Sequence, residues 1–140
     1  MKIKYTSELM GLMSIFQNKT GAKLKDCFID NNSLLTFVVE ANQLGKAIGK
    51  KAINIKILEK IFNKRIKIFE YNPDIQKFIR NLIYPLKVRE IVIQEDVVLL
   101  EAQDSKTRGY LIGRAASNLR NYENIAKRYF REIKEIKVSQ

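Results

Sequence analysis

Two eight-residue stretches decide the fold: IGKKAINI at residues 48–55 and IGRAASNL at residues 112–119. A shift of 64 positions superimposes them, and ten of the 17 positions from 45 to 61 then match their counterparts in identity or chemistry. Each stretch places a glycine and a basic residue directly before an apolar run with helical spacing. The repeat predicts two copies of one structural unit, each with a glycine turn that opens a helix.

The same order of elements is expected around each turn. In the first half, the pattern predicts a helix at 6–19, strands at 23–30 and 34–40, a short helical segment at 42–48, a helix ending near 62 and a strand at 65–69. In the second half, it predicts a helix ending before residue 85, strands at 87–94 and 97–102, a short helical segment at 106–112, a helix ending near 130 and a strand at 133–138. The boundary between two α+β domains, 1–71 and 72–140, falls between the halves.

Local details of these elements follow from residue type. Asn31 and Asn32 can adopt positive φ and are expected to form the first hairpin turn. Asn72 is expected to cap the first helix of the second half, with Pro73 at its first position. In the helix after the first glycine turn, three isoleucines at positions 53, 57 and 61 should stack on one side, with apolar side chains at 55, 58 and 62 beside them.

Positive charge is concentrated around the two turns. The chain of 140 residues has a formal net charge of +11, with 26 basic and 15 acidic residues. Residues 45–68 hold eight basic residues and one acid, and residues 108–140 hold eight and three, whereas the remaining segments carry net charges of +1 and −2. A basic surface favours polyanionic partners and fast association with them.

Several classes of function are excluded or disfavoured by composition. The chain has no histidine and one cysteine, Cys27, so zinc, haem and iron–sulfur sites are not expected, and we predict no metal and no other cofactor. Cys27 is expected to be a buried strand thiol. The repeated Glu59 and Glu123 are interpreted as partners in helix-surface ion pairs, not as a catalytic pair. No apolar run approaches the roughly 18 residues of a membrane span. We therefore expect a non-enzymatic cytoplasmic protein, monomeric and away from membranes.

The two stretches resemble the signature of KH domains, in which a Gly-x-x-Gly loop between two helices precedes an apolar helix. The element order resembles the type II KH arrangement, and two such domains in tandem, filling nearly the whole chain, look like archaeal NusA-like transcription factors. The resemblance implies a three-stranded sheet in each domain and a role in transcription elongation or termination. It also implies single-stranded RNA as the partner, with RNA polymerase as a further one.

The candidate RNA-binding residues lie in and just after the turns. They are Gly49, Lys50, Lys51, Ala52, Asn54 and Lys56 in the first copy and Gly113, Arg114, Ala115, Ala116, Asn118 and Arg120 in the second. A helix N-terminus offers unpaired N–H groups and a positive dipole end to a phosphate, and glycine lets a nucleic acid backbone come close. We expect four of these side chains on exposed helix faces: Asn54 and its counterpart Asn118, and Lys56 and its counterpart Arg120. There they either reach sugar or phosphate or are simply solvated.

Both turns carry alanine where the signature has its second glycine. Ala52 and Ala116 are expected to have helical φ, which would favour the helix by up to about 1 kcal/mol over glycine. Their methyl groups could stand where an RNA backbone would come closest. This departure leaves an alternative open, in which the chain is a degenerate KH pair that serves as a protein-interaction module on RNA polymerase or the ribosome.

Overall fold

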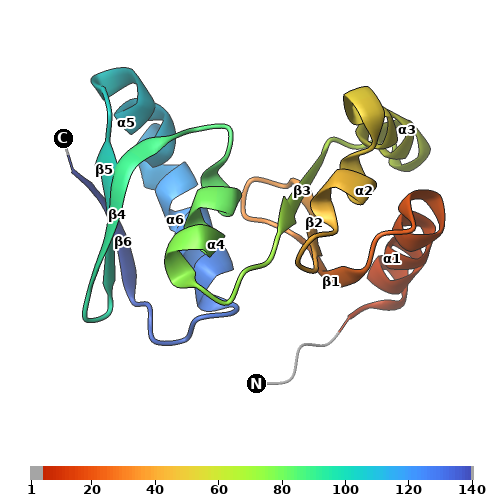
Figure 1. The fold of residues 1–140 in the computed structure, drawn as a ribbon, viewed down its shortest axis with the longest axis horizontal. Coiled ribbons are helices and arrows are strands. Elements are labelled where there is room, and N and C mark those ends of the chain that lie inside the picture. The colour runs from red at the N-terminus through yellow and green to blue at the C-terminus, as the bar shows by residue number, and fades with distance from the viewer. Residues whose placement is uncertain (1–4, 140) are drawn as a thin grey trace. The chain divides into compact units, whose positions relative to one another are not determined.

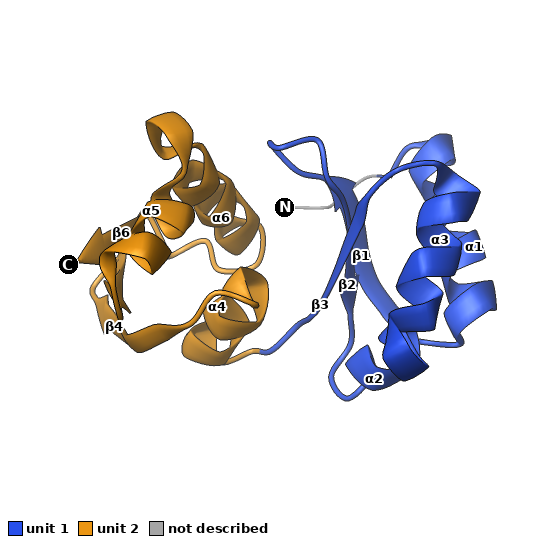
Figure 2. Cartoon of the chain, turned by 90° about the horizontal axis from the view of Figure 1, so that it is seen from above, with its two compact units in different colours: residues 1–72 blue, residues 73–140 orange. Residues whose placement is uncertain are grey.

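The chain folds into two compact units, residues 1–72 and 73–140, in a computed structural model that describes residues 5–139 (Figure 2). The first unit contains α1 (Ser7–Thr20), β1 (Leu24–Ile29), β2 (Leu35–Val39), α2 (Leu44–Ile48), the 3-10 turn η1 (Lys50–Ala52), α3 (Ile53–Phe62) and β3 (Ile66–Glu70) (Figure 1). The second contains α4 (Ile75–Ile83), β4 (Val88–Gln94), β5 (Val97–Ala102), α5 (Ser105–Ile112), the 3-10 turn η2 (Arg114–Ala116), α6 (Ser117–Lys127) and β6 (Glu135–Ser139). Both units show the expected order of helix, strand, strand, helix, helix, strand.

Each unit has one three-stranded sheet, and the two sheets share a topology. β1 runs antiparallel to β2, which runs parallel to β3, and β4, β5 and β6 repeat this pattern. In the first sheet, Phe37 of the central strand is paired with Cys27 on one side and Ile68 on the other. Parallel neighbours need a long crossover connection. In both units that crossover consists of two helices with the glycine turn between them.

The first core joins α1 and α3 to one face of the sheet. α1 begins after Thr6, whose hydroxyl accepts a hydrogen bond from the Leu9 amide at 3.1 Å, and its C-cap is Gly21 with a left-handed φ of 70°. Phe16 of α1 stacks on Phe37 of β2 with ring centroids 4.3 Å apart. Cys27 is buried in the same core, which agrees with its expected place on a strand.

The second core forms around Phe78 of α4, and two sequence expectations fail there. The helix is capped by Asp74 and not by Asn72, because the Asp74 carboxylate accepts hydrogen bonds from the amides of Gln76 and Lys77. α6 ends at Lys127, three residues before the expected end at Phe130. The chain turns there because Phe130 is buried against Phe78, with the two rings 5.2 Å apart.

The first hairpin turn also differs from its prediction. Positive φ occurs at Ser33 (62°), whereas Asn31 and Asn32 keep negative φ. The carboxylate of Asp30 accepts hydrogen bonds from the amides of Asn32 and Leu34, both at 2.9 Å. This side-chain turn organises the backbone of the hairpin and moves the left-handed residue to Ser33.

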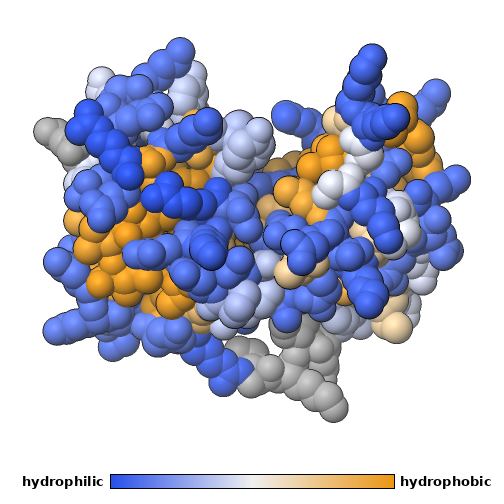
Figure 3. Space-filling view, viewed as in Figure 1, coloured by the Kyte–Doolittle hydropathy of each residue, from blue (hydrophilic) through white to orange (hydrophobic). Residues whose placement is uncertain are grey.

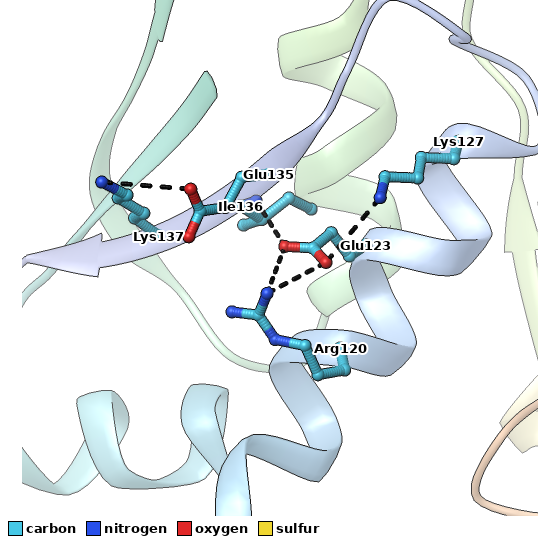
Figure 4. Close-up of polar contacts among 6 residues, drawn as sticks. All are labelled: Arg120, Glu123, Lys127, Glu135, Ile136 and Lys137. Atoms are coloured by element: carbon cyan, nitrogen blue, oxygen red, sulfur yellow. Dashed lines mark hydrogen bonds and ion pairs between the residues drawn. The ribbon is translucent and has the colours of Figure 1, made fainter. Parts of the chain in front are cut away.

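The repeated glutamates fasten the long helix of each unit to its last strand. A carboxylate oxygen of Glu59 accepts a hydrogen bond from the Ile66 amide at 3.0 Å, and one of Glu123 accepts from the Ile136 amide at 2.8 Å (Figure 4). Glu123 also forms the expected ion pair, with Arg120 at 2.8 Å. Its carboxylate is buried and not on the helix surface, however, so its main role is inside the fold.

Glu123→Ala is expected to lower the free energy of unfolding by about 1–3 kcal/mol, because the buried Ile136 amide would lose its acceptor. Glu123→Gln should recover part of this loss, since its amide oxygen can still accept the bond. Glu59→Ala provides a matched control at a less buried site and should cost less. Urea denaturation measures all three, and equal losses for the two alanine variants would contradict this account.

Candidate nucleic-acid interface

The two glycine turns have nearly the same backbone conformation. Gly49 ends α2 with φ 75° and ψ 174°, and Gly113 ends α5 with φ 73° and ψ 178°. In the first turn, Lys51 (φ 52°) and Ala52 (φ 58°) both adopt a left-handed conformation. Ala115 (φ 52°) and Ala116 (φ 60°) adopt it in the second turn. Each turn therefore places two successive non-glycine residues in a region that L-amino acids seldom occupy.

The expectation of helical φ at Ala52 and Ala116 is wrong. Both residues are the N-caps of the following helices and adopt left-handed conformations, whereas Ile53 and Ser117 directly after them are right-handed. A left-handed conformation costs an L-residue roughly 1–2 kcal/mol. Alanine at these positions therefore stores strain in the turn, where glycine would adopt the same φ at little cost.

The first glycine of each turn faces an asparagine and not open space. A Cβ atom at Gly49 would lie 3.0 Å from Nδ2 of Asn54, and one at Gly113 would lie 2.7 Å from Nδ2 of Asn118. The left-handed φ and this close packing both select glycine. The sequence predicts that these glycines let a nucleic acid backbone come close, and the structure shows that packing within the protein also favours glycine at both positions.

Basic side chains are exposed at both turns. Lys50, Lys51 and Arg114 are exposed, and the two glycines are half-buried. Within the first turn the Ala52 amide donates to the Gly49 carbonyl at 3.2 Å, and the Ile53 amide donates to the Lys50 carbonyl. The amides of Lys50 and Lys51 take no part in these bonds, and no side chain caps α3 or α6. The turn thus presents main-chain donors beside cationic side chains.

The remaining predicted residues are placed differently in the two units. Lys56 is exposed on α3. Arg120, its counterpart on α6, holds Nη1 against both carboxylate oxygens of Glu123, at 3.0 and 2.8 Å (Figure 4). Asn54 and Asn118 donate hydrogen bonds to backbone carbonyls of their own units.

The basic residues of the first unit do not all contribute to an exposed patch. Lys67 lies on β3, where burial lowers the pKa of its ammonium group, an effect that the charge of Asp30 opposes. Because its side chain is largely withdrawn from solvent, it adds little to the surface that a polyanion would meet. The charge count over residues 45–68 therefore overstates the cationic surface.

Three isoleucines form an exposed apolar side of α3. Ile53, Ile57 and Ile61 are 48%, 40% and 45% exposed, while Leu58 is buried in the core. We refer to these three residues as the isoleucine stripe. Figure 3 shows hydrophobic surface over the region of the first unit where α3 lies. The counterparts in α6 are Ser117, Asn121 and Ile125, and the last two are buried.

Comparison with known proteins matches the segment around the first turn to a known domain family. A KH domain family model matches residues 12–85, which include the Gly49 turn. The chain is 31% identical over 140 residues to "Probable transcription termination protein NusA" of Methanocaldococcus jannaschii, covering 98% of this chain and 75% of that protein. The protein of the same name from Halobacterium salinarum is 26% identical, with 99% and 100% covered. The crystal structure of APE1850 superimposes with a TM-score of 0.77 at 25% identity, covering 96% of this chain and 100% of that one.

Other kinds of site find no support in the described chain. Among residues 5–139, no group of three or more His, Cys, Asp or Glu side chains is arranged to hold a metal ion. Within the same range, no helix is both long and apolar enough to cross a membrane.

Ala116→Gly is expected to raise the free energy of unfolding by up to about 1 kcal/mol, because glycine removes the left-handed strain and loses part of that gain through its greater freedom when unfolded. Ser117→Gly is the control: it changes the neighbouring residue, which is exposed and has φ −60°, and should destabilise by about 0.5–1 kcal/mol. Urea denaturation gives both values. Destabilisation of equal size by the two glycines would refute the assignment of strain to Ala116.

Proposed function

The chain belongs to the KH domain family and is an archaeal NusA-like protein, and from this premise we propose that it binds single-stranded RNA in transcription elongation or termination. The observation that carries the proposal is the pair of strained glycine turns flanked by exposed basic side chains. KH modules clamp about four nucleotides of single-stranded backbone with such a loop. The proposed activity is binding alone and includes no catalytic step.

We further propose that each unit is a type II KH domain and that the two stand in tandem, residues 1–71 and 72–140. The family model covers the Gly49 turn and stops before the Gly113 turn. Three features support extending the assignment to the second unit: the same element order, the same sheet topology with one parallel pair, and turn dihedral angles close to those of the first turn.

The proposed contacts are of two kinds. The turn residues, which are Gly49, Lys50, Lys51 and Ala52 in one unit and Gly113, Arg114, Ala115 and Ala116 in the other, meet phosphate through main-chain amides and cationic side chains. Lys56 lies one turn further along its helix and is exposed, so it can reach the adjacent backbone. Arg120 is a weaker contact because Glu123 already holds its Nη1.

Reversing the charge of the first turn is the direct test of RNA binding. Lys50→Glu/Lys51→Glu should weaken binding of a short single-stranded RNA by about 10–100-fold, because both exposed ammonium groups belong to the proposed phosphate site. The variant should also lose about two phosphate contacts, which would lower the slope of log Kd against log salt. Arg114→Glu should weaken binding by a smaller factor. For the intact protein, a slope of log Kd against log salt of roughly 3–4 is expected if about four to six phosphates are engaged.

Lys77→Glu/Lys87→Glu is the matched control for this measurement. It makes the same change in net charge at two exposed lysines outside the glycine turns. Filter binding or fluorescence anisotropy at two salt concentrations compares the variants. If the control weakened RNA binding as much as Lys50→Glu/Lys51→Glu, binding would reflect net charge alone and the turns would not be the site.

The isoleucine stripe supports a second candidate function, docking of the first unit on RNA polymerase. Three isoleucines 40–48% exposed at positions i, i+4 and i+8 form an apolar edge that a partner protein could cover. Exposed Lys56 and Lys60 lie on the same helix, so a complementary surface would be apolar with acidic residues around it. The stripe is absent from α6, so this function would belong to the first unit alone.

Replacing the stripe separates the two candidate functions. Ile57→Ser/Ile61→Ser, which leaves Ile53 beside the glycine turn intact, should weaken binding to purified RNA polymerase by at least about tenfold, because each exposed isoleucine would lose apolar contact area. It should leave the affinity for short RNA within about twofold. Lys50→Glu/Lys51→Glu, in contrast, should weaken binding to the RNA. Surface plasmon resonance with immobilised polymerase measures the first effect, and unchanged polymerase binding would dismiss the docking function.

A further inference from the structure

We propose that Asn54 and Asn118 are positioning residues that lock the glycine turns in the conformation that receives RNA, and that they act without contacting the RNA themselves. This inference rests on the proposed RNA-binding function of the turns. It replaces the sequence-based view of both asparagines as exposed groups that either reach the nucleic acid or are solvated.

The two side chains make the same contact in both units. Nδ2 of Asn54 donates a hydrogen bond to the carbonyl oxygen of Lys46 at 3.1 Å, and Nδ2 of Asn118 donates to that of Tyr110 at 2.9 Å. Each bond spans eight residues and crosses the turn, from the first turn of the long helix back to the short helix before it. Because the acceptor is a backbone carbonyl, the contact survives the change from lysine to tyrosine at that position.

Each asparagine also fills the space beneath the first glycine. The position that a Cβ would take is 3.0 and 3.1 Å from Nδ2 and Cγ of Asn54 at Gly49, and 2.7 Å from both atoms of Asn118 at Gly113. The glycine and the asparagine therefore form a fitted pair. A side chain at Gly113 would force the Asn118 amide to move, and one at Gly49 would press on the Asn54 amide and on Cγ2 of Ile53.

The turn needs such a lock because its own backbone does not favour it. Two consecutive left-handed residues are costly without glycine, and strained conformations persist only where the surroundings fix them. α2 has only five residues, too few for a helix to be stable on its own. A side chain that ties the end of this helix to the start of α3 supplies the missing constraint at the point where the strain lies.

Loss of the lock should reduce affinity by a change of population. If the turn samples other conformations, the apparent Kd rises in proportion to the fraction of molecules that lose the binding-competent form. One hydrogen bond shifts the equilibrium between turn conformations by at most about tenfold. For each asparagine we therefore expect a change of about three- to tenfold in the population of the ordered turn and in RNA affinity.

Asn118→Ala and Asn54→Ala test the proposal through two readouts on the full chain. The first is the hydrogen-exchange rate, by NMR without RNA, of the hydrogen-bonded turn amides of Gly49, Ala52, Gly113 and Ala116, which should exchange about three- to tenfold faster in the variant turn. The second is the affinity for a short single-stranded RNA, which should fall by a similar factor. Asn124→Ala, at an exposed asparagine on α6, is the control and should change neither.

A second pair of variants tests the chemistry of the lock. Asn118→Asp keeps the shape but cannot donate to the Tyr110 carbonyl, so its turn should also exchange faster. Adding Ala116→Gly to Asn118→Ala should restore part of the protection, because glycine makes the left-handed conformation less costly. If the added glycine restored no protection, the faster exchange in Asn118→Ala would not come from a change in turn conformation, and the proposal would be overturned.

The outcomes separate this inference from the proposed function. Weaker RNA binding with unchanged exchange would overturn positioning and make the asparagines direct contacts. Faster exchange with unchanged RNA affinity, while Lys50→Glu/Lys51→Glu weakens binding, would overturn the link between turn order and recognition. If that lysine variant and Arg114→Glu both left RNA affinity unchanged, the proposed function would fail, and this inference would fail with it even if exchange became faster.

Discussion

The parallel pairing of the second and third strands in each sheet is the constraint on which the rest of the structure depends. β2 and β3, and likewise β5 and β6, point the same way, so the chain must return along the sheet before it can pair. It does so through two helices, and the change of direction between them requires a sharp turn. That turn is where Gly49 and Gly113 lie. The position of the candidate site is thus a consequence of strand direction.

The same turn concentrates the chemistry suited to an anion. A change of direction that uses left-handed residues leaves amides outside the helical hydrogen-bond pattern, and it opens a new helix whose positive end is not capped by a side chain. Lysines 50 and 51, and Arg114 in the second copy, add charge at these amides. The strain is held by contacts inside the protein, so a ligand meets a surface already in place and does not have to form it.

The order of elements could be predicted from the sequence, because apolar periodicity and the repeat act over many residues and reinforce one another. Single-residue geometry could not. Asn72 and Asp74 are both good caps, and only packing of the following helix decides between them. The left-handed φ of Ala52 was missed because alanine favours a right-handed helix, and nothing local signals that the turn overrides this preference. The inward direction of Asn54 depends on a carbonyl eight residues away, and the burial of Lys67 depends on how β3 is covered.

Comparison of the two units shows which features belong to a shared task. The glycine, the left-handed pair, the asparagine contact and the glutamate that fastens the helix to its strand are present twice with closely similar geometry. The outward face of the long helix is not shared, since α3 exposes the isoleucine stripe where α6 has Ser117, Asn121 and a buried Ile125. The requirements of folding and of the proposed RNA ligand apply to both copies and account for the first group. The stripe answers to neither requirement, because α6 folds and forms its turn without it, and this favours the proposed docking by the first unit alone.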